Sequence, residues 1–117
     1  VSYGCYLYLH AQLAIPAFPG RILLLSPVFG SSASVKTGVG FFPSRSERLG
    51  EAVRAGEFPA SERTEIHVGS EDWQSNPEKV LAFGEATSIP VNIINGKGHM
   101  LGEDYVGPLL DRWLGGI

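Results

Sequence analysis

The sequence predicts an α/β protein in which helices flank a mostly parallel sheet. Short apolar runs of strand length recur at residues 21–27, 64–68 and 89–94. Helix-compatible segments alternate with these runs, which is the order that a parallel sheet with crossover helices requires. Of the 117 residues, 44% are hydrophobic and only 18% are charged. This length and composition predict a single globular domain over residues 1–117.

The first half of the chain predicts one helix, one strand and one long irregular segment. Residues 4–14, "GCYLYLHAQLA", have no proline and no interior glycine, so they favour a helix that ends before Pro16. Residues 21–27, "RILLLSP", are typical of a strand that is covered on both faces. Residues 28–60 are rich in small residues and glycine and contain only one short helical stretch, "ERLGEAVRAGEF". A segment of this length predicts a lid or an insertion.

Regular structure is expected to return after residue 60. Residues 64–68, "TEIHV", alternate like a strand. Ser75 and Glu78 fit a capping box, and Pro77 suits the first turn of a helix that should extend to about Ala86. The apolar side of this helix is expected to consist of Val80, Leu81 and Phe83.

A last strand and a last helix are predicted at the end of the chain. Residues 89–94, "IPVNII", favour a strand, and the glycine-rich stretch "NGKGHMLGED" favours a loop. Because proline is tolerated only near the first turn of a helix, Pro108 predicts that the last helix starts close to Asp104 or later. Apolar residues then recur at helical spacing: Val106, Leu109, Leu110, Trp113 and Leu114.

Composition excludes several function classes. The net charge of −3 and the pI near 5.5 argue against a nucleic-acid partner. No apolar run approaches the roughly 20 residues of a membrane span, and no basic segment indicates a signal peptide. Cys5 is the single cysteine, so no disulfide framework is expected and a cytoplasmic location is favoured. We expect no metal and no cofactor, because the histidines lack ligand spacing and the glycine pairs do not match a nucleotide-binding motif.

Three reactive residues follow predicted strands or precede a predicted helix. Ser2 precedes the first helix, Asp72 follows the strand at 64–68, and His99 follows the strand at 89–94. Ligands of parallel sheets bind where loops leave the carboxyl ends of the strands. Taken singly, these three residues are ordinary loop residues, and Glu71 is an alternative acid. The other two histidines, at positions 10 and 67, lie within regular elements and are interpreted as packed or surface side chains.

The stretches around these residues resemble the C-terminal part of the α/β-hydrolase superfamily. "VSYG" is similar to the last four residues of the G-x-S-x-G nucleophile elbow. "HVGSEDWQSNP" resembles the strand and loop that carry the acid, and "VNIINGKGHML" resembles the final strand and histidine loop. The tail "YVGPLLDRWL" is similar to the closing helix, and the order serine, acid, histidine is that of the family.

This resemblance implies a serine hydrolase that forms an acyl-enzyme with a small-molecule ester, thioester or amide. It assigns Ser2 as the nucleophile, His99 as the base and Asp72 as the residue that orients the imidazole. The backbone N–H of Tyr3 would be one oxyanion donor, and Gly4 would allow the backbone of the turn to pass without a Cβ clash. Capture of the acyl-enzyme by an alcohol or an amine would make the protein an acyltransferase instead.

The resemblance also implies that strands preceding the elbow are missing, so the fold would be partial. The strand at 21–27 would then have an exposed edge, and we expect self-association or pairing with a complementing N-terminal segment. The alternative function is a non-catalytic α/β domain that binds a partner through this edge. The sequence does not identify the acyl group of the substrate. Residues of the 28–60 segment are candidates to contact it, although a solvated surface explains the arginines equally well: Phe29, Phe41, Phe42, Arg45, Arg48 and Arg54.

Overall fold

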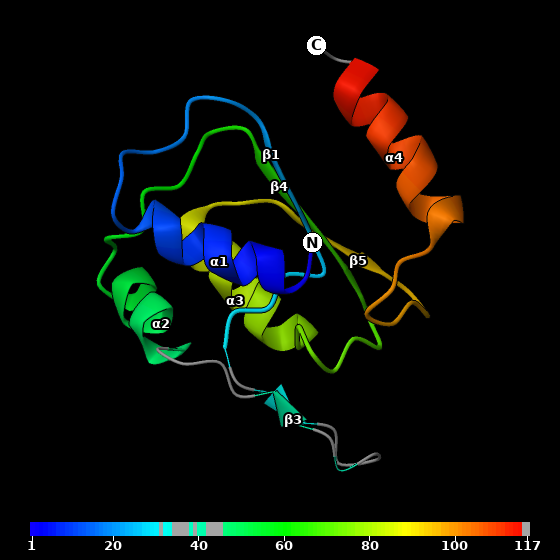
Figure 1. Cartoon of the computed structure of the whole chain (residues 1–117), viewed down its shortest axis with the longest axis horizontal. Helices are drawn as coiled ribbons and strands as arrows, with labels where there is room; N and C mark the ends of the chain where they lie inside the picture. Colours follow the sequence, from blue (N-terminus) through cyan, green and yellow to red (C-terminus); the bar gives the residue numbers. More distant parts are fainter. Residues whose placement is uncertain (31, 34–37, 39, 42–45, 116–117) are drawn as a thin grey trace.

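The computed structural model describes residues 1–30, 32–33, 38, 40–41 and 46–115 (Figure 1). Along these residues the elements are α1 (Tyr3–Gln12), β1 (Ile22–Leu25), β2 (Ser32–Ala33), β3 (Gly40–Phe41), α2 (Ser46–Arg54), β4 (Thr64–Gly69), α3 (Pro77–Thr87), β5 (Val91–Ile94) and α4 (Glu103–Gly115). The 13-residue α4 is the longest of the described helices, and none of these helices has the length and apolar character needed to cross a membrane.

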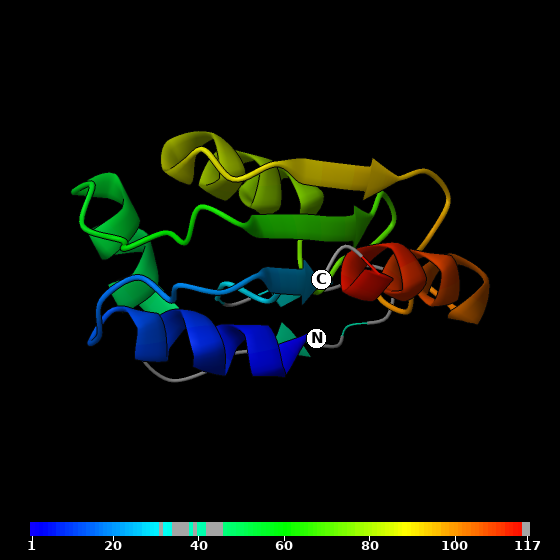
Figure 2. The same cartoon turned by 90° about the horizontal axis from the view of Figure 1, so that it is seen from above.

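Three strands form a parallel sheet in the order β1-β4-β5. Leu25 pairs with His67, and Gly69 pairs with Ile94, so the carboxyl ends of the strands lie at one edge. Figure 2 shows the three arrows pointing the same way. The short strands β2 and β3 pair antiparallel in a separate sheet. The predicted α/β architecture with a mostly parallel sheet is thereby confirmed.

The two faces of the parallel sheet carry separate apolar cores, because side chains alternate along each strand. Ile22 and Leu24 face the larger core, where α1, α2 and α3 contribute Leu9, Leu49 and Val80, all buried. On the other face Leu25 packs with Leu101 and Leu109, the latter from α4. In Figure 1, α4 accordingly lies on the opposite side of the strands from α1.

The 28–60 segment contributes in part to the larger core. Leu49 of α2 is only 1% exposed and belongs to that core, as does Phe29 in partly buried form. This helix is therefore packed against the body of the protein. A lid role for the segment stays a prediction, and Phe42 and Arg45 lie outside the described residues.

Two local predictions for the helices were wrong. The N-cap of α3 is Asn76 and not Ser75, because the Asn76 side chain accepts the backbone N–H of Lys79. Pro77 does occupy the first turn, as predicted. Leu81 is 48% exposed, so it does not share the buried side of α3 with Val80 and Phe83.

The last helix also differs from its predicted pattern. It begins at Glu103, one residue before Asp104 and so close to the predicted start, but Pro108 lies beyond the first turn and the helix forgoes one backbone hydrogen bond there. Leu109 is buried, but Leu110 and Leu114 are 39% and 59% exposed. The apolar stripe of α4 is therefore only partly covered by the sheet.

A partly buried polar network ties α4 to the middle strand. The side chain of His67, on β4, is 4% exposed. Its Nε2 lies 2.6 Å from Glu65 Oε1, and its Nδ1 lies 2.5 Å from the hydroxyl of Tyr105. Because a carboxylate only accepts, Nε2–H donates to Glu65 and Nδ1 accepts from Tyr105. Arg112 also donates to Glu65, at 2.9 Å, so two residues of α4 are held by the sheet.

The charge of Glu65 is stabilised within this network. Burial by itself would raise the pKa of Glu65, but hydrogen bonds from Arg112 and His67 lower it below its usual value. A lowered pKa in the folded state means that the ionised carboxylate stabilises the fold. The network should therefore weaken in acid.

Glu65→Gln is expected to lower the free energy of unfolding by about 1–2 kcal/mol at neutral pH, since it removes charge-assisted hydrogen bonds at a partly exposed site. The difference from the wild type should be complete above the ordinary glutamate pKa of about 4.3. It should disappear as the pH falls through the lowered pKa of Glu65. Urea denaturation between pH 2 and pH 7 measures it, with the exposed Glu62 changed to Gln as the matched control. A difference that is constant over this range would contradict the role of the Glu65 charge.

Candidate active site

Ser2 lies in a strained turn directly before α1, beside the carboxyl end of β1. Its backbone has φ 54° and ψ −122°, a conformation that costs free energy for any residue with a Cβ. The N–H of Ser2 donates to the carbonyl of Leu25 at 3.0 Å, which fixes the turn to the end of β1. Tyr3 is the first residue of α1. The Ser2 side chain is thus presented at the N-terminus of a helix, at the carboxyl edge of the sheet.

The structure brings Ser2, His99 and Asp72 together in one hydrogen-bonded row. Ser2 Oγ lies 2.7 Å from His99 Nε2. His99 Nδ1 lies 2.9 Å from Asp72 Oδ2 and 3.0 Å from Oδ1. Because the Asp72 carboxylate accepts, His99 donates from Nδ1, and its Nε2 is left to accept the proton of the Ser2 hydroxyl. Ser2 and His99 are 97 positions apart in the sequence, and all three residues meet at one edge of the sheet.

The carboxylate of Asp72 is buried and held in place by its own loop. Its side chain is 0% exposed. Oδ1 accepts the backbone N–H groups of Gln74 and Ser75, each at 3.0 Å, which fixes the orientation of the carboxylate. The alternative acid, Glu71, is exposed and forms no hydrogen bond with His99 in the part of the chain that the structure describes. The geometry therefore favours Asp72 over Glu71 as the partner of His99.

The loop that carries His99 is held by two serines that the sequence reasoning did not single out. Ser26 Oγ donates to the carbonyl of His99 at 2.7 Å, and Ser26 itself is 1% exposed. Its backbone has φ 50°, and its N–H donates to the carbonyl of His67. Ser70 Oγ accepts the N–H of Gly96 at 2.9 Å. The signal for Ser26 in the sequence was its place between an apolar strand and a proline.

Glycine matters at the end of β4 and not at the start of α1. A Cβ at Gly4 would meet no heavy atom within 4 Å. The prediction that the turn requires glycine at this position for steric reasons was therefore wrong. A Cβ at Gly69 would instead collide with the backbone carbonyls of Lys97 and Gly98. Gly69 thus lets the His99 loop pass close to the end of β4.

The helix N-terminus beside Ser2 can stabilise negative charge. The backbone N–H of Tyr3 lies at the first position of α1, where the helix dipole is positive. Tyr3 is 43% exposed, and its ring stacks on the ring of Tyr6 with the centroids 5.3 Å apart. The arrangement can therefore activate a hydroxyl, orient an imidazole and place a helix N-terminus next to the reacting oxygen.

Comparisons with known proteins identify no relative of this chain. No family model, no curated protein and no solved structure matches the chain. The class that the fold and the site define is an α/β protein with a serine, a histidine and an aspartate in hydrogen-bonded sequence. Any activity assigned to it rests on the chemistry of those side chains.

Gly69→Ala is expected to destabilise the fold by about 1–3 kcal/mol, since the added methyl group forces the Lys97–Gly98 backbone away from β4. The nuclear magnetic resonance signals of the His99 ring should shift at the same time. Gly98→Ala is the matched control, because a Cβ there meets nothing within 4 Å. Equal effects of the two substitutions on stability and on the His99 signals would show that the close approach at Gly69 does not position the loop.

Proposed function

We propose that the protein is a serine hydrolase of the α/β-hydrolase type, which cleaves a small ester, thioester or amide through an acyl-enzyme. The observation that carries this proposal is the contact of Ser2 Oγ with His99 Nε2 at 2.7 Å, with His99 oriented from behind by buried Asp72. A hydroxyl, a base and a carboxylate in this order are what nucleophilic acyl transfer requires.

The proposed reaction begins with attack of Ser2 Oγ on the acyl carbonyl. His99 Nε2 takes the hydroxyl proton, and Asp72 stabilises the imidazolium that forms. The tetrahedral intermediate then collapses as His99 returns the proton to the leaving group, which departs as an alcohol, thiol or amine. Water, deprotonated by His99, next attacks the ester formed on Ser2. The bond between the acyl carbon and Ser2 Oγ then breaks, His99 returns the proton to Ser2 Oγ, and the acid is released. An alcohol or amine in place of water would give acyl transfer.

Two further features support the α/β-hydrolase type. The positive φ of Ser2 at the entrance to α1 is the strained turn that exposes a nucleophile in that fold. The three residues also occur in the order serine, acid, histidine, as the sequence resemblance implies. The three-stranded parallel sheet agrees with the carboxyl edge as the place of the site.

The rate of the proposed reaction depends on how well the oxyanion of the tetrahedral intermediate is stabilised. We assign the backbone N–H of Tyr3 as one donor, since it follows the nucleophile at the start of α1. The resemblance assigns a second donor to a loop that precedes the nucleophile. Loss of one such donor costs roughly 10²–10³ in rate. The Tyr3 N–H is therefore expected to contribute strongly to the rate at which the protein hydrolyses activated esters.

A fluorophosphonate probe should label the protein at Ser2, because serine attack displaces fluoride without needing a leaving group matched to the pocket. Ser2→Ala should abolish labelling, and Asp72→Asn should slow it by at least about 10²-fold, since the imidazole loses its orientation. Labelled peptides identified by mass spectrometry give the position.

The matched control is Ser75→Ala, which removes a buried hydroxyl three residues from Asp72 that has no hydrogen-bond partner in the described part of the chain. It should label like the wild type. Labelling at another serine, or undiminished labelling of Ser2→Ala, would overturn the assignment.

A second candidate function is a binding domain that acts through the edge of β1. Among the described residues β1 pairs with β4 on one side only. On α1, which lies beside β1 (Figure 2), Tyr3 and Leu7 are 43% and 55% exposed. An open edge next to apolar side chains favours association with another chain.

If this edge associates, the chain should form dimers or larger species whose fraction increases with protein concentration. Leu7→Glu should shift the population toward monomer, because it replaces an exposed apolar side chain of α1 by a charged one. Leu81→Glu is the control, since Leu81 is 48% exposed but belongs to α3. Size-exclusion chromatography with light scattering measures the mass. A wild type that is monomeric at all concentrations would exclude self-association.

A further inference from the structure

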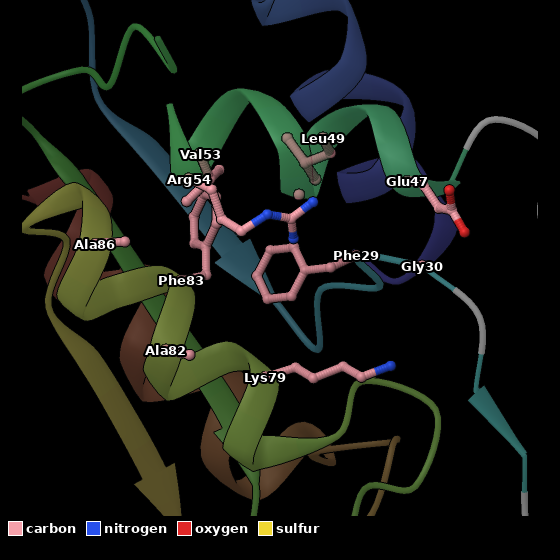
Figure 3. A pocket seen from close by; sticks show the side chains of 11 residues that line it. Phe29, Gly30, Glu47, Leu49, Val53, Arg54, Lys79, Ala82, Phe83 and Ala86 are labelled. Atoms are coloured by element: carbon pink, nitrogen blue, oxygen red, sulfur yellow. The ribbon is translucent and has the colours of Figure 1, made fainter. Parts of the chain in front are cut away.

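A pocket with a volume of about 760 Å³ opens between α2 and α3. Its size falls within the range of small-molecule sites, about 300–1,000 Å³. Figure 3 shows that its walls come from both helices and from the segment that follows β1. Neither Ser2 nor Asp72 nor His99 lines it, so the proposed reaction does not account for it.

The inner wall of the pocket is apolar and includes side chains that are largely buried. Phe29 and Phe83 are stacked with ring centroids 4.5 Å apart, and Phe83 is 6% exposed. Leu49 lies on the α2 side and is 1% exposed. On the α3 side, Ala82 and Ala86 are one helical turn apart and leave space between the helices because their side chains are small. Such a surface favours an aliphatic chain, since each methylene group removed from water adds to binding.

The polar lining of the pocket carries a net positive charge. Arg54 and Lys79 contribute two cations, and Glu47 contributes one carboxylate. In Figure 3 the Arg54 guanidinium lies between Leu49 and Phe29, whereas Lys79 lies on the α3 side. Two cations and one carboxylate leave a charge of about +1, which suits a monoanion.

Gly50 allows Arg54 to take this position. A Cβ at Gly50 would lie 3.2 Å from Arg54 Nη1, which is tighter than ordinary van der Waals contact. The guanidinium therefore folds back along α2 over a glycine and reaches the apolar part of the pocket. A guanidinium in this place can bind both oxygens of a carboxylate.

We propose that this pocket binds an aliphatic carboxylate, with the alkyl chain against Phe29, Phe83 and the two alanines and the carboxylate on Arg54 and Lys79. In Figure 3 the Arg54 guanidinium lies beside the ring of Phe29, so a cation and an apolar surface adjoin in one pocket, as a ligand with a carboxylate and an alkyl chain requires. The site is separate from Ser2, so the proposal holds whether or not Ser2 is a nucleophile.

Binding of octanoate and of octanol to the Ser2→Ala chain tests this proposal without any covalent reaction at Ser2. Isothermal titration calorimetry should show octanoate binding at least about tenfold tighter than octanol, the difference expected for a charge-assisted hydrogen bond. Backbone amide signals of α2 and α3 should shift on titration. The double change Arg54→Gln and Lys79→Gln should remove the preference for octanoate and leave octanol binding unchanged.

Two further variants make the test specific. Ala82→Phe should weaken both ligands, because the ring fills the pocket. Arg48→Gln should change neither, since Arg48 is an exposed cation of α2 that does not line this pocket. Equal affinity for octanoate and octanol, wild-type octanoate affinity in the Arg54/Lys79 double variant, or no binding of octanoate would each overturn the proposal. Labelling of Ser2 by the fluorophosphonate probe is independent of these outcomes.

Discussion

The parallel pairing of β1, β4 and β5 is the constraint on which the candidate site depends. Parallel strands end at the same edge, so the residues that follow them meet in space although they are far apart in sequence. Ser26 follows β1, Asp72 follows β4 and His99 follows β5, and the turn at Ser2 is hydrogen-bonded to the last residue of β1. A shift in register would separate the hydroxyl, the imidazole and the carboxylate together.

Contacts from the strands and from α4 fix the position of the loop that carries the His99 imidazole. On one side Ser26 donates to the His99 carbonyl, and Gly69 lets the loop approach β4 closely. On the other side α4, which follows the loop, is anchored by Arg112 and Tyr105 to the Glu65–His67 pair of β4. The loop with His99 is thus held between two elements that the sheet already positions. The proposed reaction would need such support, since small displacements of a base reduce catalysis strongly.

The sequence was sufficient for features that depend on local pattern. The apolar runs predicted the parallel strands, and the order of serine, aspartate and histidine indicated which loops would meet. The sequence was insufficient for features that depend on tertiary contacts, such as the N-cap of α3 and the role of Gly69. Ser75 and Asn76 are adjacent residues that can each cap a helix, and only the backbone geometry selects Asn76. Gly69 resembles any strand-end glycine until the neighbouring loop packs on it, and the exposure of Leu81 depends on which side of α3 the sheet covers.

The hydrogen-bonded row from Ser2 to Asp72 is tested most directly by nuclear magnetic resonance of the His99 ring. The geometry predicts an imidazole that carries a proton on Nδ1, seen as a low-field proton signal bonded to that nitrogen, since Nδ1 lies 2.9 Å from Asp72. Nε2 should carry the nitrogen shift of an acceptor, because it receives the Ser2 hydroxyl at 2.7 Å. A proton on Nε2 instead, or no protected Nδ1 proton, would contradict the account.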